Sequence, residues 1–340
     1  MADKILVVGP SWVGDMVMAQ AIFKLLKQQN PKVVIDVLAP EWSRAIVERM
    51  PEVNKTLSMP IGHGQLQLKV RYRMGRALRL AGYQQAIIIP NSFKSALIPF
   101  WAKIPKRTGW RRELRGILLT DARSLNKQRY PLMVQRYLAL ALPKNVAIPE
   151  NWPRPSLEIA YDRLNQVREQ YGLMLDQSPV LALCPGAEFG PAKCWPTAYY
   201  AEVANAFIKK GWQVWLFGSA KDSETAAEIQ VLTEQRSRDL TGRTSLANAI
   251  DLLSLANLVI SNDSGLMHVV AALQRPQIAI YGSTPPGETP PLNAKSKILY
   301  LNVACSPCFK RVCPRVEEYH QCMRELKPAQ VLQTAEELLV

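Results

Sequence analysis

The chain has 340 residues, which is long enough for two domains with cores of their own. Its hydrophobic content of 48% and charged content of 21% are ordinary for a folded protein, and no apolar run approaches the roughly 20 residues that cross a bilayer. The net charge of +14 arises in residues 61–140, which carry 16 Lys and Arg against Glu113 and Asp121. This excess indicates an anionic partner (nucleic acid, an anionic membrane surface or a phosphorylated substrate) or else a solvated basic face.

The first half alternates strand-like and helix-like segments. It opens with Met1-Ala2-Asp3-Lys4 and enters a strand at once, so we expect no secretory leader and a cytoplasmic location. Short apolar runs predict strands at residues 5–8, 33–38 and 86–89. Helical spacing predicts helices at residues 15–29, 42–50 and 66–81, with a short connection or strand at 51–59. Such alternation is typical of a parallel sheet flanked by helices, and thus of the α/β class.

A proline-rich stretch at residues 143–156 marks a boundary, and a second α/β alternation follows it. Strands are predicted at residues 180–183, 212–217, 258–261 and 278–281. Helices are predicted at residues 161–171, 197–210, 222–235 (capped by Asp222), 246–256 (capped by Ser245), 264–273 and from Pro328 onward. We therefore expect a domain at residues 1–155, a linker region at 156–178, a second domain at 179–326 and a C-terminal helix at 327–340.

The first predicted strand runs into the turn Gly9-Pro10-Ser11-Trp12-Val13-Gly14-Asp15. This turn lacks the Lys-Ser/Thr pair of a nucleotide-hydrolase P-loop, and Ser11 stands where the dinucleotide fingerprint has its second glycine. A P-loop hydrolase and a dehydrogenase are therefore both disfavoured. Asp15 opens a helix, where it can act as a general base facing a cleft or simply stabilise the helix dipole.

A second turn of this kind is Asn262-Asp263-Ser264-Gly265-Leu266-Met267-His268, between a predicted strand and a predicted helix. The amides of Ser264 and Gly265 can hold a diphosphate, whereas Asp263, being negative, suits sugar hydroxyls better. His268 lies one helical turn beyond Ser264, so it faces the same ligand or is a buried, hydrogen-bonded side chain. Helix capping is the alternative reading of the whole turn.

Lys193 follows the strand predicted at 180–183, where a lysine suits a phosphate as a point charge or is an ordinary surface residue. Near the C-terminus, Cys305, Cys308, Cys313 and Cys322 cluster in the sequence. The C-x2-C spacing is that of zinc sites, but the second pair lies further apart, so free packing cysteines are the alternative to a structural metal.

The basic half also holds aromatic residues, a mixture that can bind nucleic acid, but it shows no known nucleic-acid-binding motif. The segment Ser95–Trp101, next to Lys103, Lys106 and Arg107, suits contact with an anionic lipid surface instead. Ordinary core with a solvated edge is the alternative reading of this segment.

Taken together, these motifs resemble the ADP-heptose:lipopolysaccharide heptosyltransferases, which form glycosyltransferase family 9. The resemblance spans nearly the whole chain, in the expected order. It rests on Gly14-Asp15, Lys193-x-Trp195-Pro196, Phe217-Gly218-Ser219-Ala220, Asp263-Ser264-Gly265-Leu266-Met267-His268, Tyr281-Gly282-x-Thr284 and Cys305-Ser306-Pro307-Cys308-Phe309-Lys310. Within the family, the members that transfer to an acceptor already carrying one heptose are most similar.

The resemblance implies a GT-B architecture, with two Rossmann-like domains and the active site in the cleft between them. It implies an inverting transferase that takes heptose from ADP-L-glycero-D-manno-heptose and passes it to the first heptose of the lipopolysaccharide inner core, built on Kdo and lipid A. No metal and no cofactor are expected to take part. Peripheral contact with the anionic inner face of the inner membrane is expected, and a nucleic-acid partner is not.

The resemblance also implies roles for particular residues. Asp15 is the expected base, and Lys193 with the Ser264 and Gly265 amides would stabilise the leaving diphosphate. The remaining donor contacts would come from Asp263 on the heptose and from Ser219 and Lys221 beside the adenosine. His268 would lie near the phosphates or pack behind them. The acceptor phosphates would meet Arg107, Arg111 and Arg112.

Three alternatives remain open. The first is a heptosyltransferase that acts on Kdo2-lipid A without a prior heptose. The second is a non-catalytic sugar-binding protein with the two-domain cleft of a solute receptor. The third is a nucleic-acid-binding protein that uses the basic half, for which binding would fall steeply with salt.

Overall fold

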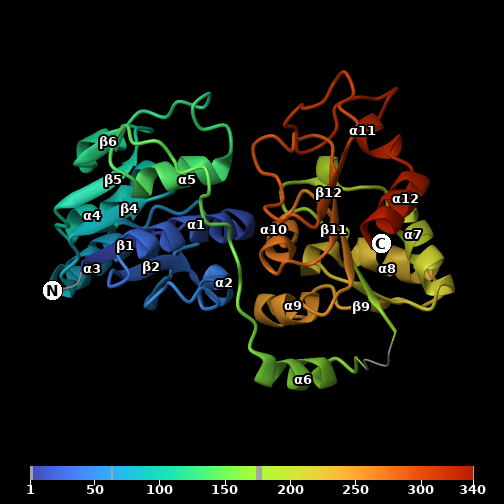
Figure 1. The fold of residues 1–340 in the computed structure, drawn as a ribbon. Helices are drawn as coiled ribbons and strands as arrows, with labels where there is room; N and C mark the ends of the chain where they lie inside the picture. Colours follow the sequence, from blue (N-terminus) through green and yellow to red (C-terminus); the bar gives the residue numbers. More distant parts are fainter. Residues whose placement is uncertain (1–2, 63, 174–177, 340) are drawn as a thin grey trace. The chain divides into compact units, whose positions relative to one another are not determined.

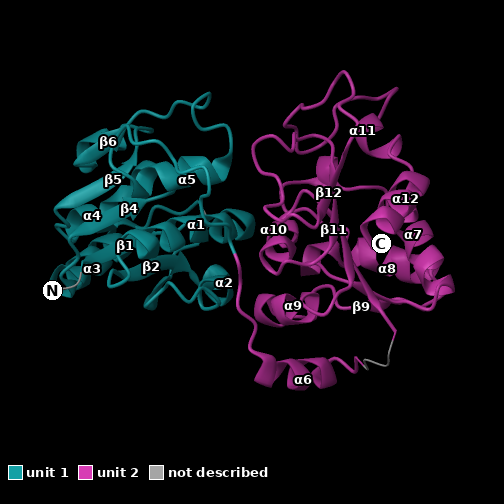
Figure 2. Cartoon of the chain, viewed as in Figure 1, with its two compact units in different colours: residues 1–155 teal, residues 156–340 magenta. Residues whose placement is uncertain are grey.

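The computed structural model describes residues 3–62, 64–173 and 178–339. The chain divides into two compact units, Met1–Pro155 and Ser156–Val340, shown in Figure 2. The division falls at the end of the proline-rich stretch. Among the described residues, no helix has the length and apolar character needed to cross a membrane.

Unit 1 is built on a six-stranded sheet whose strands are all parallel (Figure 1). In spatial order the strands are β3 (Lys55–Met59), β2 (Val34–Pro40), β1 (Lys4–Val8), β4 (Gln85–Ile88), β5 (Lys106–Trp110) and β6 (Asp121–Arg123). β1 pairs with β2 on one side and β4 on the other, so the strand order reverses there. Doubly wound sheets bind their ligands at the carboxyl ends of the strands beside such a reversal.

The helices of unit 1 lie in the connections between its strands, except for the last one, which follows β6. The α-helices are α1 (Val13–Gln29), α2 (Arg44–Val47), α3 (Leu68–Leu78), α4 (Leu97–Trp101) and α5 (Met133–Ala141). Short 3₁₀ turns are η1 (Glu41–Ser43), η2 (Arg79–Ala81), η3 (Phe93–Ala96) and η4 (Arg115–Leu118). Helix α1 packs against α5, and α3 packs against α4. Because α1 follows β1 directly, Asp15 in its first turn lies near the carboxyl end of the central strand.

The segment predicted to contact lipid, Ser95–Trp101, instead forms the end of η3 and helix α4. Its residues from Ser95 to Pro99 are buried, and Ala96, Leu97 and Ile98 belong to the core beneath β1 and β4. Side chains in that core cannot reach a bilayer, so the predicted lipid contact is wrong for residues 95–99. Phe100 is exposed and Trp101 is half-buried.

Unit 2 repeats the same plan with a second six-stranded parallel sheet. In spatial order its strands are β12 (Ser296–Tyr300), β11 (Gln277–Tyr281), β10 (Leu258–Asn262), β7 (Val180–Cys184), β8 (Gln213–Leu216) and β9 (Arg238–Asp239). The strand order reverses between β7 and β10. The loops after these two strands carry Lys193 and Asp263.

The helices of unit 2 include one in the region expected to form a linker. They are α6 (Tyr161–Gln170), α7 (Thr197–Lys209), α8 (Ser223–Leu232), α9 (Leu246–Leu253), α10 (Gly265–Ala272), α11 (Gln321–Arg324) and α12 (Pro328–Leu339), with the 3₁₀ turns η5 (Pro191–Lys193) and η6 (Ala220–Asp222). Helix α6 packs against α9, so residues 156–173 are part of unit 2 and not a free linker. The rest of the predicted linker includes residues 174–177, which lie outside the described residues.

Two predicted helix caps differ in outcome. The Ser245 hydroxyl accepts a hydrogen bond from the Asn248 amide, as expected of an N-cap. Asp222 precedes α8 but does not cap it through its side chain. Its carboxylate accepts hydrogen bonds from Ser219 instead, which closes the turn after β8.

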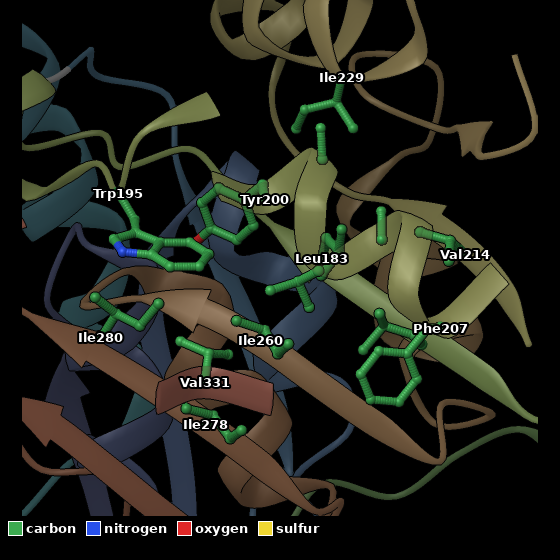
Figure 3. Close-up of a cluster of buried hydrophobic side chains, with 14 of the residues drawn as sticks. Leu183, Trp195, Tyr200, Phe207, Val214, Ile229, Ile260, Ile278, Ile280 and Val331 are labelled. Atoms are coloured by element: carbon green, nitrogen blue, oxygen red, sulfur yellow. The ribbon is translucent and has the colours of Figure 1, made fainter. Parts of the chain in front are cut away.

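The core of unit 2 joins the central strands to α7, α8 and α12 (Figure 3). Trp195 and Tyr200 lie together at one end of this core, with the ring centroids 5.0 Å apart in an edge-to-face arrangement. Both side chains are fully buried. Because Trp195 is two residues from Lys193, this packing anchors the loop that carries the lysine.

Candidate functional site

The polar centre of unit 2 is the carboxylate of Asp263, at the junction of β10 and α10. Its Oδ2 accepts hydrogen bonds from the Lys193 ammonium at 2.5 Å and from the Thr284 hydroxyl at 2.6 Å. The three residues come from the loops after β10, β7 and β11, which are neighbouring strands. The fold therefore brings together Lys193 and Asp263, both identified from sequence, and adds Thr284, for which the motifs indicate no separate role.

The Lys193–Asp263 contact is an ion pair in which both side chains are largely buried. The sequence assigned the lysine to a phosphate and the carboxylate to sugar hydroxyls, but here each has the other as a partner. The ring of Phe189 lies 5.0 Å from the Lys193 ammonium and further restricts it. A buried cation and a buried carboxylate stabilise each other, because either alone would be costly to desolvate.

Asn262 fixes the loop that presents Lys193. Its Oδ1 accepts hydrogen bonds from the Trp195 amide and the Tyr200 hydroxyl, each at 3.0 Å, and its Nδ2 donates to the Pro185 carbonyl at 2.6 Å. The side chain is fully buried. One amide thus ties together β10, the loop after β7 and the start of α7. The sequence analysis places Asn262 at the start of the turn that contains Asp263 and predicts no role for it.

A long irregular segment between β12 and α11 supports the same loops from another side. The Ala192 amide donates to the Arg311 carbonyl at 3.0 Å, and the His320 ring lies 3.2 Å from the Ala192 carbonyl. The Ser283 carbonyl accepts from the Cys308 and Phe309 amides at 3.1 and 2.8 Å. The segment therefore holds both the loop of Lys193 and the loop of Thr284.

Ser264 and Gly265 begin α10, with Ser264 at the N-cap in an extended conformation. The Ser264 side chain does not cap the helix and lies 3.2 Å from the Ser261 hydroxyl. The Ser264 side chain therefore leaves the first-turn amides of α10 uncapped, beside Asp263. Backbone amides in this position can bind an anionic ligand.

His268, one turn into α10, is buried close to this centre. Burial is the main cause that lowers its pKa to about 4, with Lys193 acting in the same direction and Asp263 opposing it. At neutral pH the imidazole is therefore uncharged. A neutral ring can hydrogen-bond a phosphate, but it adds no positive charge to the site.

Ser219 and Lys221 lie in the turn after β8. The Ser219 amide and hydroxyl both donate to Asp222 Oδ2, at 2.8 and 2.9 Å. Gly186 and Gly218 make room for that carboxylate, since a Cβ on Gly186 would lie 2.3 Å from it. The Lys221 ammonium pairs with Glu188, and both side chains are exposed. Pairs of this kind contribute little to stability.

The polar centre of unit 1 is Asp15. Its Oδ1 accepts a hydrogen bond of 2.9 Å from the hydroxyl of Tyr137, which comes from α5. Burial, followed by the neighbouring carboxylate, raises the pKa of Tyr137 well above its ordinary value. The phenol therefore stays protonated and keeps donating to Asp15. Sequence reasoning did not identify Tyr137.

The three arginines expected to meet acceptor phosphates differ in their surroundings. Arg107 donates to the carbonyls of Leu118 and Ile104, at 2.7 and 2.5 Å, and burial lowers its pKa. Its guanidinium thus holds the backbone in this structure, and the contact with acceptor phosphates stays a prediction for Arg107. Arg111 and Arg112 are exposed.

Arg115, which the sequence did not single out, is fully buried. It donates to the Trp110 carbonyl at 2.8 Å and to the Ser95 hydroxyl at 3.0 Å. Burial lowers its pKa to about 10, so it is charged at neutral pH. It ties the loop after β4 to the loop after β5.

The four C-terminal cysteines line one cavity of about 40 Å³, together with His320. All six cysteine thiols are free. Burial, followed by the neighbouring thiols, raises the pKa of Cys322 to about 11, so it is a thiol at neutral pH. In the part of the chain that the structure describes, no group of three or more His, Cys, Asp or Glu side chains is arranged to hold a metal ion.

Comparison with known proteins gives a consistent result. The model of glycosyltransferase family 9 (heptosyltransferase) matches residues 71–320. A lipopolysaccharide heptosyltransferase 2 of Salmonella typhimurium strain LT2 is 46% identical over 99% of this chain and 98% of its own length. One of Escherichia coli strain K12 is 45% identical over 99% of each.

A solved structure of the E. coli ADP-heptose lipopolysaccharide heptosyltransferase II also resembles this chain. It aligns with a TM-score of 0.88 at 44% identity, covering 99% of this chain and 98% of that one. The similarity therefore covers both units and not one of them alone.

Proposed function

This chain belongs to glycosyltransferase family 9, the heptosyltransferases, and from that premise we propose its substrates and mechanism. The enzyme is a glycosyltransferase of GT-B architecture. It takes heptose from ADP-L-glycero-D-manno-heptose and transfers it to the first heptose of the lipopolysaccharide inner core. The observation that carries this proposal is the near full-length identity of 45–46% to relatives named heptosyltransferase 2.

The centre around Asp263 serves the donor. When the bond to ADP breaks, negative charge develops on the diphosphate, and preorganised positive groups stabilise it best. Lys193 and the amides at the start of α10 supply that stabilisation from this chain's own residues. The Asp263 carboxylate orients heptose hydroxyls, and Thr284 holds the carboxylate in place. Ser219 and Lys221 border the adenosine.

Asp15 serves the acceptor as general base. It takes the proton from the attacking hydroxyl of the acceptor heptose, whose oxygen bonds to the anomeric carbon of the donor. The bond from that carbon to the diphosphate breaks, and ADP leaves with the electron pair. Attack from the face opposite the leaving group inverts the anomeric centre. Tyr137 fixes the orientation of the Asp15 carboxylate through its 2.9 Å hydrogen bond.

The acceptor also carries phosphates and a lipid anchor. Arg111 and Arg112 are exposed and can reach phosphates without breaking internal hydrogen bonds. Because lipid A is anchored in a bilayer, the enzyme meets its acceptor at the cytoplasmic, anionic surface of the inner membrane.

A single transfer experiment tests this proposal. ADP-heptose is offered with heptosyl-Kdo2-lipid A or with Kdo2-lipid A, and the product is identified by mass spectrometry. We expect one heptose to be added to the heptosylated acceptor only. Transfer only to Kdo2-lipid A would make the enzyme a first heptosyltransferase, and transfer to neither would contradict the proposed substrates.

A further inference from the structure

Helix α3 (Leu68–Leu78) presents apolar side chains to solvent. Leu68 and Tyr72, one turn apart, are 49% and 44% exposed, and Leu80 in the following turn η2 is 97% exposed. Side chains on the same face of a helix recur at such spacings. Leu80 adds almost nothing to the core of unit 1, and it shares the exposed face of this segment with Leu68 and Tyr72. Apolar side chains gathered on one exposed face mark an interaction site, whereas a single exposed leucine does not.

The exposed end of α4 continues this surface. The Tyr72 and Trp101 rings meet edge to face, with centroids 5.5 Å apart, and Arg79 Nε donates to the Trp101 carbonyl at 2.9 Å. Gly75 permits the close approach, because a Cβ there would lie 2.6 Å from the Cβ of Trp101. Phe100, the neighbour of Trp101, is 40% exposed. The two helices thus form a single surface.

The charges on this surface are all positive. Residues 53–112 contain twelve Lys and Arg and no Asp or Glu. On and beside the two helices, the exposed basic residues are Lys69, Arg73, Arg76, Lys103 and Lys106. Apolar side chains bordered by Lys and Arg are typical of helices that lie in the interface of an anionic membrane. We call this set of residues, with Leu68, Tyr72, Leu80 and Phe100, the α3–α4 surface.

We propose that the α3–α4 surface docks the enzyme on an anionic lipid bilayer. Leu68, Leu80 and Phe100 enter the boundary between headgroups and acyl chains, while the basic residues pair with lipid phosphates. Their long side chains can keep the charge at headgroup level while the stems lie along the apolar region. The proposal rests on the proposed function only for the lipid anchor of the acceptor.

The apolar members of the surface favour a membrane over a nucleic acid. Nucleic acids are bound through phosphate contacts and through bases stacked on aromatic rings. The exposed leucines Leu68 and Leu80 contribute to neither interaction, but they gain directly from burial in lipid. The surface therefore carries a feature that a membrane uses and a nucleic acid does not.

Vesicle binding tests the proposal directly. The full chain is sedimented with vesicles of phosphatidylglycerol and phosphatidylcholine, or of phosphatidylcholine alone. We expect binding to the anionic vesicles, weakening as salt rises, and at least tenfold less binding for Leu68→Ser/Leu80→Ser. A matched control is Val231→Ser/Val316→Ser, whose valines are 69% and 90% exposed on unit 2, and it should bind like the wild type.

Turnover on two acceptors separates this proposal from the proposed function. Leu68→Ser/Leu80→Ser should transfer heptose normally to a deacylated, water-soluble acceptor, but several-fold more slowly to the acceptor embedded in anionic vesicles. If the wild-type enzyme uses neither acceptor but still binds anionic vesicles, and the double variant does not bind them, the proposed function fails and the docking surface stands.

Two outcomes would overturn the docking proposal. One is undiminished vesicle binding by Leu68→Ser/Leu80→Ser with normal circular dichroism. The other is saturable binding of single-stranded RNA that anionic vesicles do not displace, which would assign the surface to nucleic acid.

Discussion

The polar centres of the two units are built differently. Around Asp263, side chains from three loops converge on one largely buried carboxylate, and Asn262 and the segment before α11 brace the loops. In unit 1, Asp15 is held by a tyrosine, while Arg111 and Arg112 lie exposed on a separate loop. A centre braced by internal hydrogen bonds suits the proposed nucleotide-sugar donor, because preorganised charges reduce the cost of ordering the site on binding. Exposed cations suit a large lipid-linked acceptor, which can be met at several points.

The largest effect is expected from a substitution at Asp15, the polar centre of unit 1. We expect Asp15→Asn to lower kcat by about 10³-fold, because the amide keeps the shape and can still accept from Tyr137 but cannot take a proton. The rate of ADP release in the presence of heptosyl-Kdo2-lipid A measures transfer. ADP affinity and the melting temperature serve as controls and should stay at wild-type values. A kcat within tenfold of the wild type would remove Asp15 from the role of base.

Lys193 tests the donor side of the comparison. We expect Lys193→Ala to lower kcat by about 10²-fold and to weaken ADP binding, since the leaving diphosphate loses its cation and Asp263 is left as a buried, unpaired charge. Steady-state kinetics and calorimetry with ADP measure the two effects. Lys210→Ala is the matched control, because Lys210 pairs with Glu336 on the surface of the same unit. Equal effects of the two substitutions would refute the donor role.

The burial of His268 makes the stability of the folded chain sensitive to acid. Its pKa in the folded state is about 4, below the ordinary value of 6.5, so between these values the unfolded chain binds a proton that the folded chain does not. Stability is therefore full above pH 6.5 and falls as the pH drops toward 4. The loss should approach roughly 3 kcal/mol, because each tenfold change in proton affinity corresponds to about 1.4 kcal/mol.

Chemical denaturation at a series of pH values measures this loss. His268→Gln should remove most of the decline between pH 6.5 and 4, whereas His320→Gln should leave most of it in place. A variant at His268 with the same pH profile as the wild type would mean that the histidine is not held neutral by burial.

The parts of the fold that could be predicted from sequence are those with uniform local signals. The strands at residues 5–8, 180–183 and 258–261 are continuous apolar runs, and each is a buried central strand. β5 (Lys106–Trp110) was not predicted, because Lys-Arg-Thr-Gly-Trp contains neither an apolar run nor an alternation. β12 (Ser296–Tyr300) was missed as an edge strand with exposed side chains.

In the candidate site, too, only the features with a local sequence signal could be predicted. Lys193 and Asp263 could be identified because each follows a strand that the apolar pattern marks, and parallel strands end at one edge. Their direct contact, across 70 residues of sequence, depends on a side-chain arrangement that no local pattern encodes. Tyr137 was missed for the same reason, since it reaches Asp15 only through the packing of α1 against α5.

The smallest effect is expected at Arg111 and Arg112, the exposed residues that we propose contact the acceptor. Arg111→Gln/Arg112→Gln should raise the KM for heptosyl-Kdo2-lipid A by about threefold to tenfold and leave kcat and the donor KM unchanged. Solvated cations contribute modestly to binding, and salt screens them. The increase in the acceptor KM caused by this double substitution should therefore be smaller at high salt. Steady-state kinetics at low and high ionic strength measure both effects.

Two further variants sharpen this expectation. Lys32→Gln/Lys144→Gln removes two exposed positive charges elsewhere in unit 1, and it should leave the acceptor KM unchanged. Arg107→Gln should lower stability by about 1 kcal/mol or more, because the carbonyls of Leu118 and Ile104 lose their donor, while the acceptor KM stays the same. If Arg107→Gln lowered stability and also raised the acceptor KM, unit 1 would contain a braced cation that contacts the acceptor, and the contrast between the two centres would not hold.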